Sequence, residues 1–123
     1  MSIAEKKTLI IGATPNPERY AYKAASMLYK QAIPFVNMGI KAGEVLGQPI
    51  LQEKTPLSDI HTVTLYISPN KQMEWREYIA SLKPKRVIFN PGTENPEIRQ
   101  YFESQGIQTI EACTLVMLST GQF

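Results

Sequence analysis

A turn suited to binding phosphate is the clearest chemical feature of the sequence. A continuous apolar run ends at Gly12, whose missing Cβ would let a phosphate approach the backbone of Gly12 and Ala13. Thr14 and Asn16 offer side-chain donors, and Arg19 could add a charge-assisted, bidentate contact. A helix that begins close to Arg19 would add the unpaired N–H groups of its first turn. An ordinary strand-to-helix turn also favours glycine, proline and asparagine, so that alternative stays open.

The sequence disfavours a nicotinamide-dinucleotide site without excluding it. Gly12 is the only glycine of its turn, so the G-x-G-x-x-G spacing of dinucleotide-binding loops is absent. The second predicted strand ends at Asn37 and Met38, where a dinucleotide-binding domain would place an acidic residue that holds a ribose hydroxyl.

Two more polar segments follow predicted strands. Ser68 and Pro69 come after the β-branched run 62–67, and the turn at 90–95 contains Pro91, Gly92 and Asn95. Because the carboxyl ends of parallel strands meet at one edge of a sheet, these residues are expected near the first turn. The second segment has an equally good structural interpretation, since asparagine, proline and glutamate at 95–97 form a capped helix start.

The usual catalytic arrangements are missing. His61, the sole histidine, precedes a strand and is expected on the surface at the end of the sheet opposite the site. Cys113, the sole cysteine, is expected to be an inert, buried packing residue. One histidine and one cysteine cannot build a metal cage, and neither a Walker A sequence nor a Ser-His-Asp order is present. We therefore predict no catalytic activity of the chain's own.

The elements that must position these residues alternate between short strands and longer helices. Strands are predicted at 8–11, 34–37, 62–67, 86–90 and 108–110, with 49–51 as a minor edge strand. Helices are predicted after residues 17, 69 and 95, and Trp75 and Tyr78 on the second helix are expected in the core. The alternation predicts one domain over residues 1–123. Its expected fold is a three-layer, doubly wound α/β fold of Rossmann type, with a mainly parallel sheet of five or six strands.

Composition narrows the class of protein. The chain has 123 residues, 43% hydrophobic and 20% charged, as in ordinary globular proteins. Its net charge of +2 is spread along the sequence, which argues against nucleic-acid binding. No apolar stretch reaches the roughly 20 residues of a membrane span, and residues 1–7 lack the apolar core of a signal peptide. Together with the single cysteine, these features predict a cytoplasmic protein with no membrane partner.

The motifs, taken in order, resemble those of small stand-alone CoA-binding domain proteins. This Rossmann-like family is similar to the N-terminal CoA-binding domain of the succinyl-CoA synthetase α subunit. The matching segments are Ile11–Tyr20, Pro34–Asn37, Gly43–Gly47, Asn90–Asn95 and Glu111–Thr114. The resemblance covers nearly the whole chain, and the ordered set is more specific than any single motif. Met38 departs from the family pattern, in which a proline commonly follows the asparagine.

The resemblance implies coenzyme A or an acyl-CoA at the carboxyl edge of the sheet. It implies that the phosphate-bearing part contacts Gly12, Ala13, Thr14, Asn16 and Arg19. It places Asn37 and Lys41 near the adenosine, Ser68 and Pro69 along the cleft, and Pro91, Gly92 and Asn95 against the pantetheine arm. The ligase relatives carry their phosphorylated histidine in a second domain, and His61 matches no such motif, so the resemblance implies binding rather than acyl-CoA synthesis.

Three functions remain open at this point. The leading hypothesis is a non-catalytic CoA-binding protein, acting as a sensor, a carrier or a partner subunit, either as a homo-oligomer or with a partner enzyme. The second is an NAD- or other nucleotide-dependent enzyme fragment that needs a partner chain. The third is an interaction module that kept the fold and lost the ligand, which would show an occluded cleft and a large exposed apolar patch.

Overall fold

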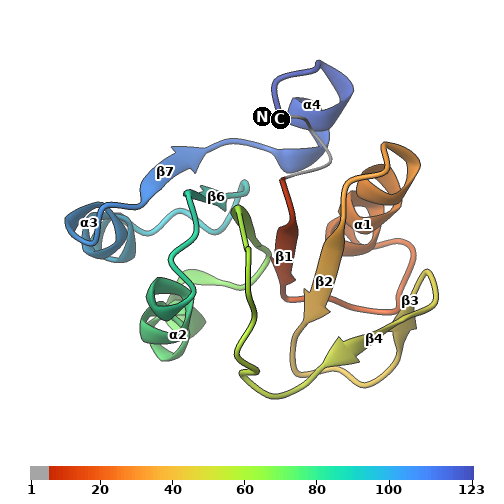
Figure 1. The fold of residues 1–123 in the computed structure, drawn as a ribbon, viewed down its shortest axis with the longest axis horizontal. Coiled ribbons are helices and arrows are strands. Elements are labelled where there is room, and N and C mark those ends of the chain that lie inside the picture. Colours follow the sequence, from red (N-terminus) through yellow and green to blue (C-terminus); the bar gives the residue numbers. More distant parts are fainter. Residues whose placement is uncertain (1–5) are drawn as a thin grey trace.

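A seven-stranded sheet forms the centre of the computed structural model, which describes residues 6–123 (Figure 1). The strands are β1 (Thr8–Ile11), β2 (Phe35–Met38), β3 (Glu44–Val45), β4 (Gln48–Leu51), β5 (Thr62–Leu65), β6 (Arg86–Phe89) and β7 (Gln108–Glu111). Their spatial order is β3-β4-β2-β1-β5-β6-β7, and every pairing is parallel except the antiparallel β3–β4 pair. The predicted doubly wound α/β fold is confirmed, with more strands than the five or six expected.

Helices cover both faces of the sheet. The helices are α1 (Tyr20–Lys30), α2 (Arg76–Ser81), α3 (Pro96–Ser104) and α4 (Thr114–Ser119). A 3-10 helix, η2 (Pro69–Glu74), directly precedes α2. α1 packs against α4 and α2 packs against α3, and Figure 1 shows the two pairs on opposite sides of the central strands. In β1, Leu9 and Ile11 join the core under α2 and α3, while Ile10 joins the core under α1 and α4. This strict alternation produces the three layers.

Three local predictions need correction. The strand predicted at 49–51 is present as β4, but the two-residue strand β3, which was not predicted, forms the edge of the sheet, so β4 is interior rather than at the edge. Pro49 is tolerated because β4 pairs with β2 only through Ile50 and Leu51. The predicted helix after Pro69 is divided into η2 and α2, and the short helix α4 was not predicted.

The strand order of the sheet reverses at the neighbouring strands β1 and β5. β1 lies between β2 and β5, so the chain first builds the β2 side and then returns to build the β5 side. Open α/β sheets bind ligands at such a switch, beyond the carboxyl ends of the strands. The loops that follow β1, β2 and β5 therefore define the candidate site.

The structure also bears on the predicted relation to membranes. No helix within residues 6–123 is long and apolar enough to cross a membrane. The prediction that no signal peptide is present rests mainly on residues 1–5, which lie outside the described residues.

Candidate functional site

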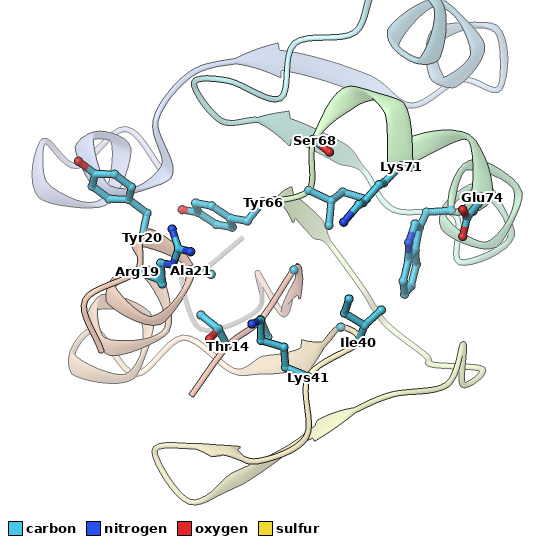
Figure 2. Close-up of a pocket in the computed structure, with 15 residues that line it drawn as sticks. Thr14, Arg19, Tyr20, Ala21, Ile40, Lys41, Tyr66, Ser68, Lys71 and Glu74 are labelled. Carbon is cyan, nitrogen blue, oxygen red and sulfur yellow. The ribbon is translucent and has the colours of Figure 1, made fainter. Parts of the chain in front are cut away.

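A cavity of about 630 Å³ lies at the carboxyl ends of β1, β2 and β5 (Figure 2). Its size falls within the usual range for small-molecule and cofactor sites. It is lined by Gly12, Ala13, Thr14, Arg19, Tyr20, Ala21, Gly39, Ile40, Lys41, Tyr66, Ile67, Ser68, Lys71, Glu74 and Trp75. Six of the twelve residues predicted for the site lie in this lining: Gly12, Ala13, Thr14, Arg19, Lys41 and Ser68.

The amino end of α1 faces this cavity without a side-chain cap. Arg19 occupies the N-cap position with no side-chain capping hydrogen bond, and the first turn contains no acidic residue. The backbone N–H of Lys23 donates to the Arg19 carbonyl oxygen at 3.1 Å, which begins the helical pattern. The N–H groups of Tyr20 and Ala21, both in the cavity lining, have no acceptor within residues 6–123. This end of the helix therefore presents free donors and the positive pole of its dipole to a ligand.

Gly12 and Ala13 shape the wall of the cavity, but their N–H groups are already engaged. Both donate to the carbonyl oxygen of Met38, at 2.9 and 3.1 Å. Gly12 has φ +97°, and a Cβ there would lie 2.6 Å from the carbonyl oxygen of Tyr66. The glycine is thus required for the close approach of the β1 turn to the end of β5. A phosphate that approaches this backbone, as predicted, would find both N–H groups already bonded to Met38.

The turn between β1 and α1 is held by its own polar side chains. The Thr14 hydroxyl oxygen accepts from the Asn16 N–H at 3.2 Å, and the Asn16 Oδ1 accepts from the Glu18 N–H at 3.0 Å. Thr14 is buried at the cavity wall, whereas Asn16 is exposed and lies outside the lining. Asn16 therefore orders the turn, and the structure does not place it in the cavity as predicted.

Three cationic side chains from three different loops surround the cavity. Arg19 comes from the turn after β1, Lys41 from the loop after β2, and Lys71 from η2 after β5 (Figure 2). None of them forms an ion pair with a carboxylate in the described part of the chain. Glu74 is the one acidic residue in the lining and stands at the far end from Arg19 in Figure 2. The balance of charge favours an anionic ligand.

Asn37, which was predicted to lie near the adenosine, is not among the residues that line the cavity. Its neighbours in register are Ile10 on β1 and Ile50 on β4, both members of the core under α1, and it is only 1% exposed. Neither atom of its amide has a hydrogen-bond partner within the described residues. The alternation of side chains along β2 turns Asn37 toward the helix layer rather than toward the carboxyl edge.

The residues predicted to face a pantetheine arm form structural contacts instead. Asn95 caps α3 by accepting from the Ile98 N–H at 3.3 Å, and its amide donates to the Pro69 carbonyl oxygen at 3.2 Å. Pro91 and Gly92 are exposed, and none of Pro69, Pro91, Gly92 and Asn95 lines the cavity. The capped helix start predicted at 95–97 is confirmed.

Buried Asn90 explains why the turn after β6 is polar. Its amide nitrogen donates to the Thr64 hydroxyl at 2.7 Å and to the Leu65 carbonyl oxygen at 2.9 Å. Its amide oxygen accepts from the Thr114 N–H at 2.8 Å. One side chain thereby joins β5, β6 and α4 beside the site, which is a structural role.

Nine of the lining residues were not predicted from the sequence. They are Tyr20, Ala21, Gly39, Ile40, Tyr66, Ile67, Lys71, Glu74 and Trp75. Helical spacing carried a usable signal, because Lys71, Glu74 and Trp75 stand three and four positions apart and share one face of the segment. Trp75 does belong to the core, as predicted, and also contributes to the cavity wall. Burial raises the pKa of Tyr66 to about 12, so its hydroxyl stays protonated near neutral pH.

His61 and Cys113 stand apart from the cavity lining. The Nδ1 atom of His61 lies 2.7 Å from the Thr62 hydroxyl, at the amino end of β5, and the ring is half-buried rather than on the open surface. Cys113 occupies the N-cap position of α4 and is half-buried, not buried as predicted. Within residues 6–123, no cluster of three His, Cys, Asp or Glu side chains is suited to hold a metal ion.

The chain matches the family model described as a CoA binding domain over residues 6–119. A crystal structure of a protein described only as uncharacterized has 53% identity and a TM-score of 0.95, with 96% of this chain and 98% of that chain covered. A hypothetical protein from Pyrococcus horikoshii OT3 has 26% identity and a TM-score of 0.85, with coverage of 94% and 82%. A Thermus thermophilus protein of 21% identity shares the fold at a TM-score of 0.80, with coverage of 96% and 90%. No curated protein matches the chain. The family model covers almost all of the sequence, and the chain therefore belongs to the CoA-binding domain family.

Proposed function

We propose that the cavity at the carboxyl edge binds coenzyme A or an acyl-CoA, and that the chain is a binding protein or partner subunit rather than a self-sufficient enzyme. The observation that carries this proposal is the uncapped amino end of α1. The free N–H groups of Tyr20 and Ala21 converge there with the unpaired Arg19 guanidinium. Unpaired donors and a positive dipole end are what a pyrophosphate requires.

The charge around the cavity supports CoA over NAD. CoA carries a 3′-phosphate in addition to its pyrophosphate, whereas NAD carries the pyrophosphate alone. Arg19, Lys41 and Lys71 provide three cations against the single carboxylate of Glu74. A more highly charged nucleotide gains more from this arrangement, and the gain decreases with added salt.

The open cavity also bears on the third hypothesis, an interaction module without a ligand. That hypothesis expects an occluded cleft, but the cavity holds about 630 Å³ and is bordered by exposed Tyr20 and Ile40. The open cavity therefore favours a protein that binds a small molecule over an interaction module whose cleft is occluded.

Calorimetric titration of the purified chain with CoA, acetyl-CoA, NAD and AMP tests the proposal. We expect binding of CoA and acetyl-CoA, with Arg19→Ala weakening it about 10- to 100-fold, the range for loss of a charge-assisted contact. Lys85→Ala is the matched control, because Lys85 is exposed and precedes the amino end of β6, away from the cavity lining. Binding of NAD alone would support the nucleotide-dependent enzyme fragment, and a folded protein that binds none of the four ligands would refute the proposal.

A further inference from the structure

Lys41 and Lys71 are two cations of the cavity lining besides Arg19, which lies at the amino end of α1. They come from loops on opposite sides of β1, after β2 and after β5. Figure 2 shows Arg19 beside the α1 turn, the Lys41 side chain reaching toward Thr14, and the Lys71 side chain extending from η2 toward the interior of the cavity. A ligand with two separated phosphate groups would be needed to engage both ends of this arrangement.

The segment that carries Lys71 is firmly anchored. Gln72 is 1% exposed, and its amide nitrogen donates to the carbonyl oxygens of Thr93 at 2.7 Å and Ile67 at 3.2 Å. The Lys71 backbone N–H donates to the Ser68 carbonyl oxygen at 3.0 Å. The Asn95 amide holds the Pro69 carbonyl oxygen in the same segment. The backbone that presents Lys71 is therefore preorganised, which lowers the entropic cost of a contact to a ligand.

The other charged groups on this wall leave the Lys71 ammonium free for a ligand. Lys54 lies over the Trp75 ring at 5.1 Å from its centroid, and its ammonium donates to the Glu74 backbone carbonyl. The Glu74 carboxylate forms no ion pair with Lys71. Within residues 6–123 the Lys71 ammonium donates no hydrogen bond, so a phosphate would be its first strong partner.

We propose that Lys71 is a specificity-determining residue that selects ligands carrying a phosphate on the adenosine ribose, as CoA does at its 3′ position. This inference rests on the proposed function and deepens it. The pyrophosphate lies at Arg19 and the free N–H groups of α1, and the ribose phosphate lies between the walls that carry Lys41 and Lys71. Lysine is a point-charge phosphate ligand and tolerates the geometry of a single phosphate monoester.

Calorimetric affinities for CoA and for 3′-dephospho-CoA test this assignment. The wild type is expected to bind CoA at least about tenfold more tightly than dephospho-CoA. Lys71→Gln should weaken CoA by about that factor and leave dephospho-CoA unchanged, which removes most of the discrimination. Adenosine 3′,5′-bisphosphate, which lacks the pantetheine arm, should show the same dependence on Lys71. Lys85→Gln removes an equal charge from an exposed site and should preserve the wild-type ratio.

The outcomes separate this inference from the proposed function. Equal binding of CoA and dephospho-CoA by the wild type would overturn the inference while the proposed function stands. A Lys71→Gln variant that weakens both ligands equally would overturn it as well, and so would a loss of discrimination confined to Lys41→Gln. If neither ligand binds the folded wild type, both proposals fail together. Because Lys71 is exposed, unfolding of its variant is not expected, and a thermal melt checks this directly.

Discussion

Replacing Gly12 with alanine is expected to destabilise the folded protein by about 2 to 5 kcal/mol. Gly12 has φ +97°, where an L-residue costs roughly 1 to 2 kcal/mol. The new Cβ would also lie 2.6 Å from the carbonyl oxygen and 2.8 Å from the carbonyl carbon of Tyr66. Both atoms belong to the backbone, so β1 and β5 must separate at the cavity wall, which costs roughly 1 to 3 kcal/mol more.

Equilibrium unfolding in urea measures this loss, with fluorescence of Trp75, the sole tryptophan, as the signal. Gly92→Ala is the matched control, because Gly92 has φ +92° and a Cβ added there would meet no atom within 4 Å. Gly92→Ala has the cost of an L-residue at positive φ but no clash with a neighbouring atom, so its free energy of unfolding should fall by only about 1 to 2 kcal/mol. Equal losses in the two variants would refute the contact with Tyr66. A stable Gly12→Ala variant that no longer binds CoA would restore the phosphate-approach interpretation of Gly12.

Three further predictions concern residues outside the cavity. Asn37→Leu is expected to raise the free energy of unfolding in urea by roughly 1 to 3 kcal/mol, because the Asn37 amide is buried without a partner within residues 6–123. The affinity for CoA should stay unchanged. Weaker CoA binding by a stable Asn37→Leu variant would restore the predicted adenosine contact. Asn90→Ala should cost about 2 to 4 kcal/mol, since three hydrogen bonds are lost in the core; a loss below about 1 kcal/mol would contradict that role. Burial and, to a smaller extent, the nearby Arg86 charge lower the pKa of His61 from 6.5. The unfolded chain therefore binds the proton more readily than the folded chain, so the free energy of unfolding should decrease as pH falls below 6.5. His61→Gln should flatten that part of the pH–stability curve, and an unchanged slope would exclude His61 as its source.

Elements with strong local signals were predictable from the sequence. β1 and β6 each contain three consecutive apolar residues, Leu9–Ile11 and Val87–Phe89, and all residues of both strands are buried because helices cover both faces of the sheet. α3 begins at Pro96, as the asparagine, proline and glutamate at 95–97 indicate, and Asn95 makes the capping bond. In these segments the chemistry that fixes the element lies within a few residues of it, so no knowledge of tertiary contacts is needed.

Elements that depend on distant contacts were not predictable. β3 has only two residues, and its register is set by its pairing with β4 rather than by any pattern of its own. The break between η2 and α2 falls at Trp75, where buried Gln72 binds the Thr93 carbonyl oxygen on another loop. A bond between residues 21 positions apart leaves no trace in helical periodicity.

The residues of the candidate site were likewise only partly predictable, because other parts of the protein compete for the same hydrogen-bonding groups. Residue type and a place after a strand indicate which side chains can bind a ligand, but not whether the protein already uses them. Asn16 and Asn95 carry suitable groups and use them in a turn and a helix cap. Arg19 and Lys71 have equally ordinary sequence contexts, yet the fold leaves both without an ionic partner among residues 6–123 at one cavity. The candidate ligand site is therefore marked by polar groups that line the cavity and remain unpaired after the backbone and caps are satisfied. Such groups become identifiable only when the long-range contacts are known.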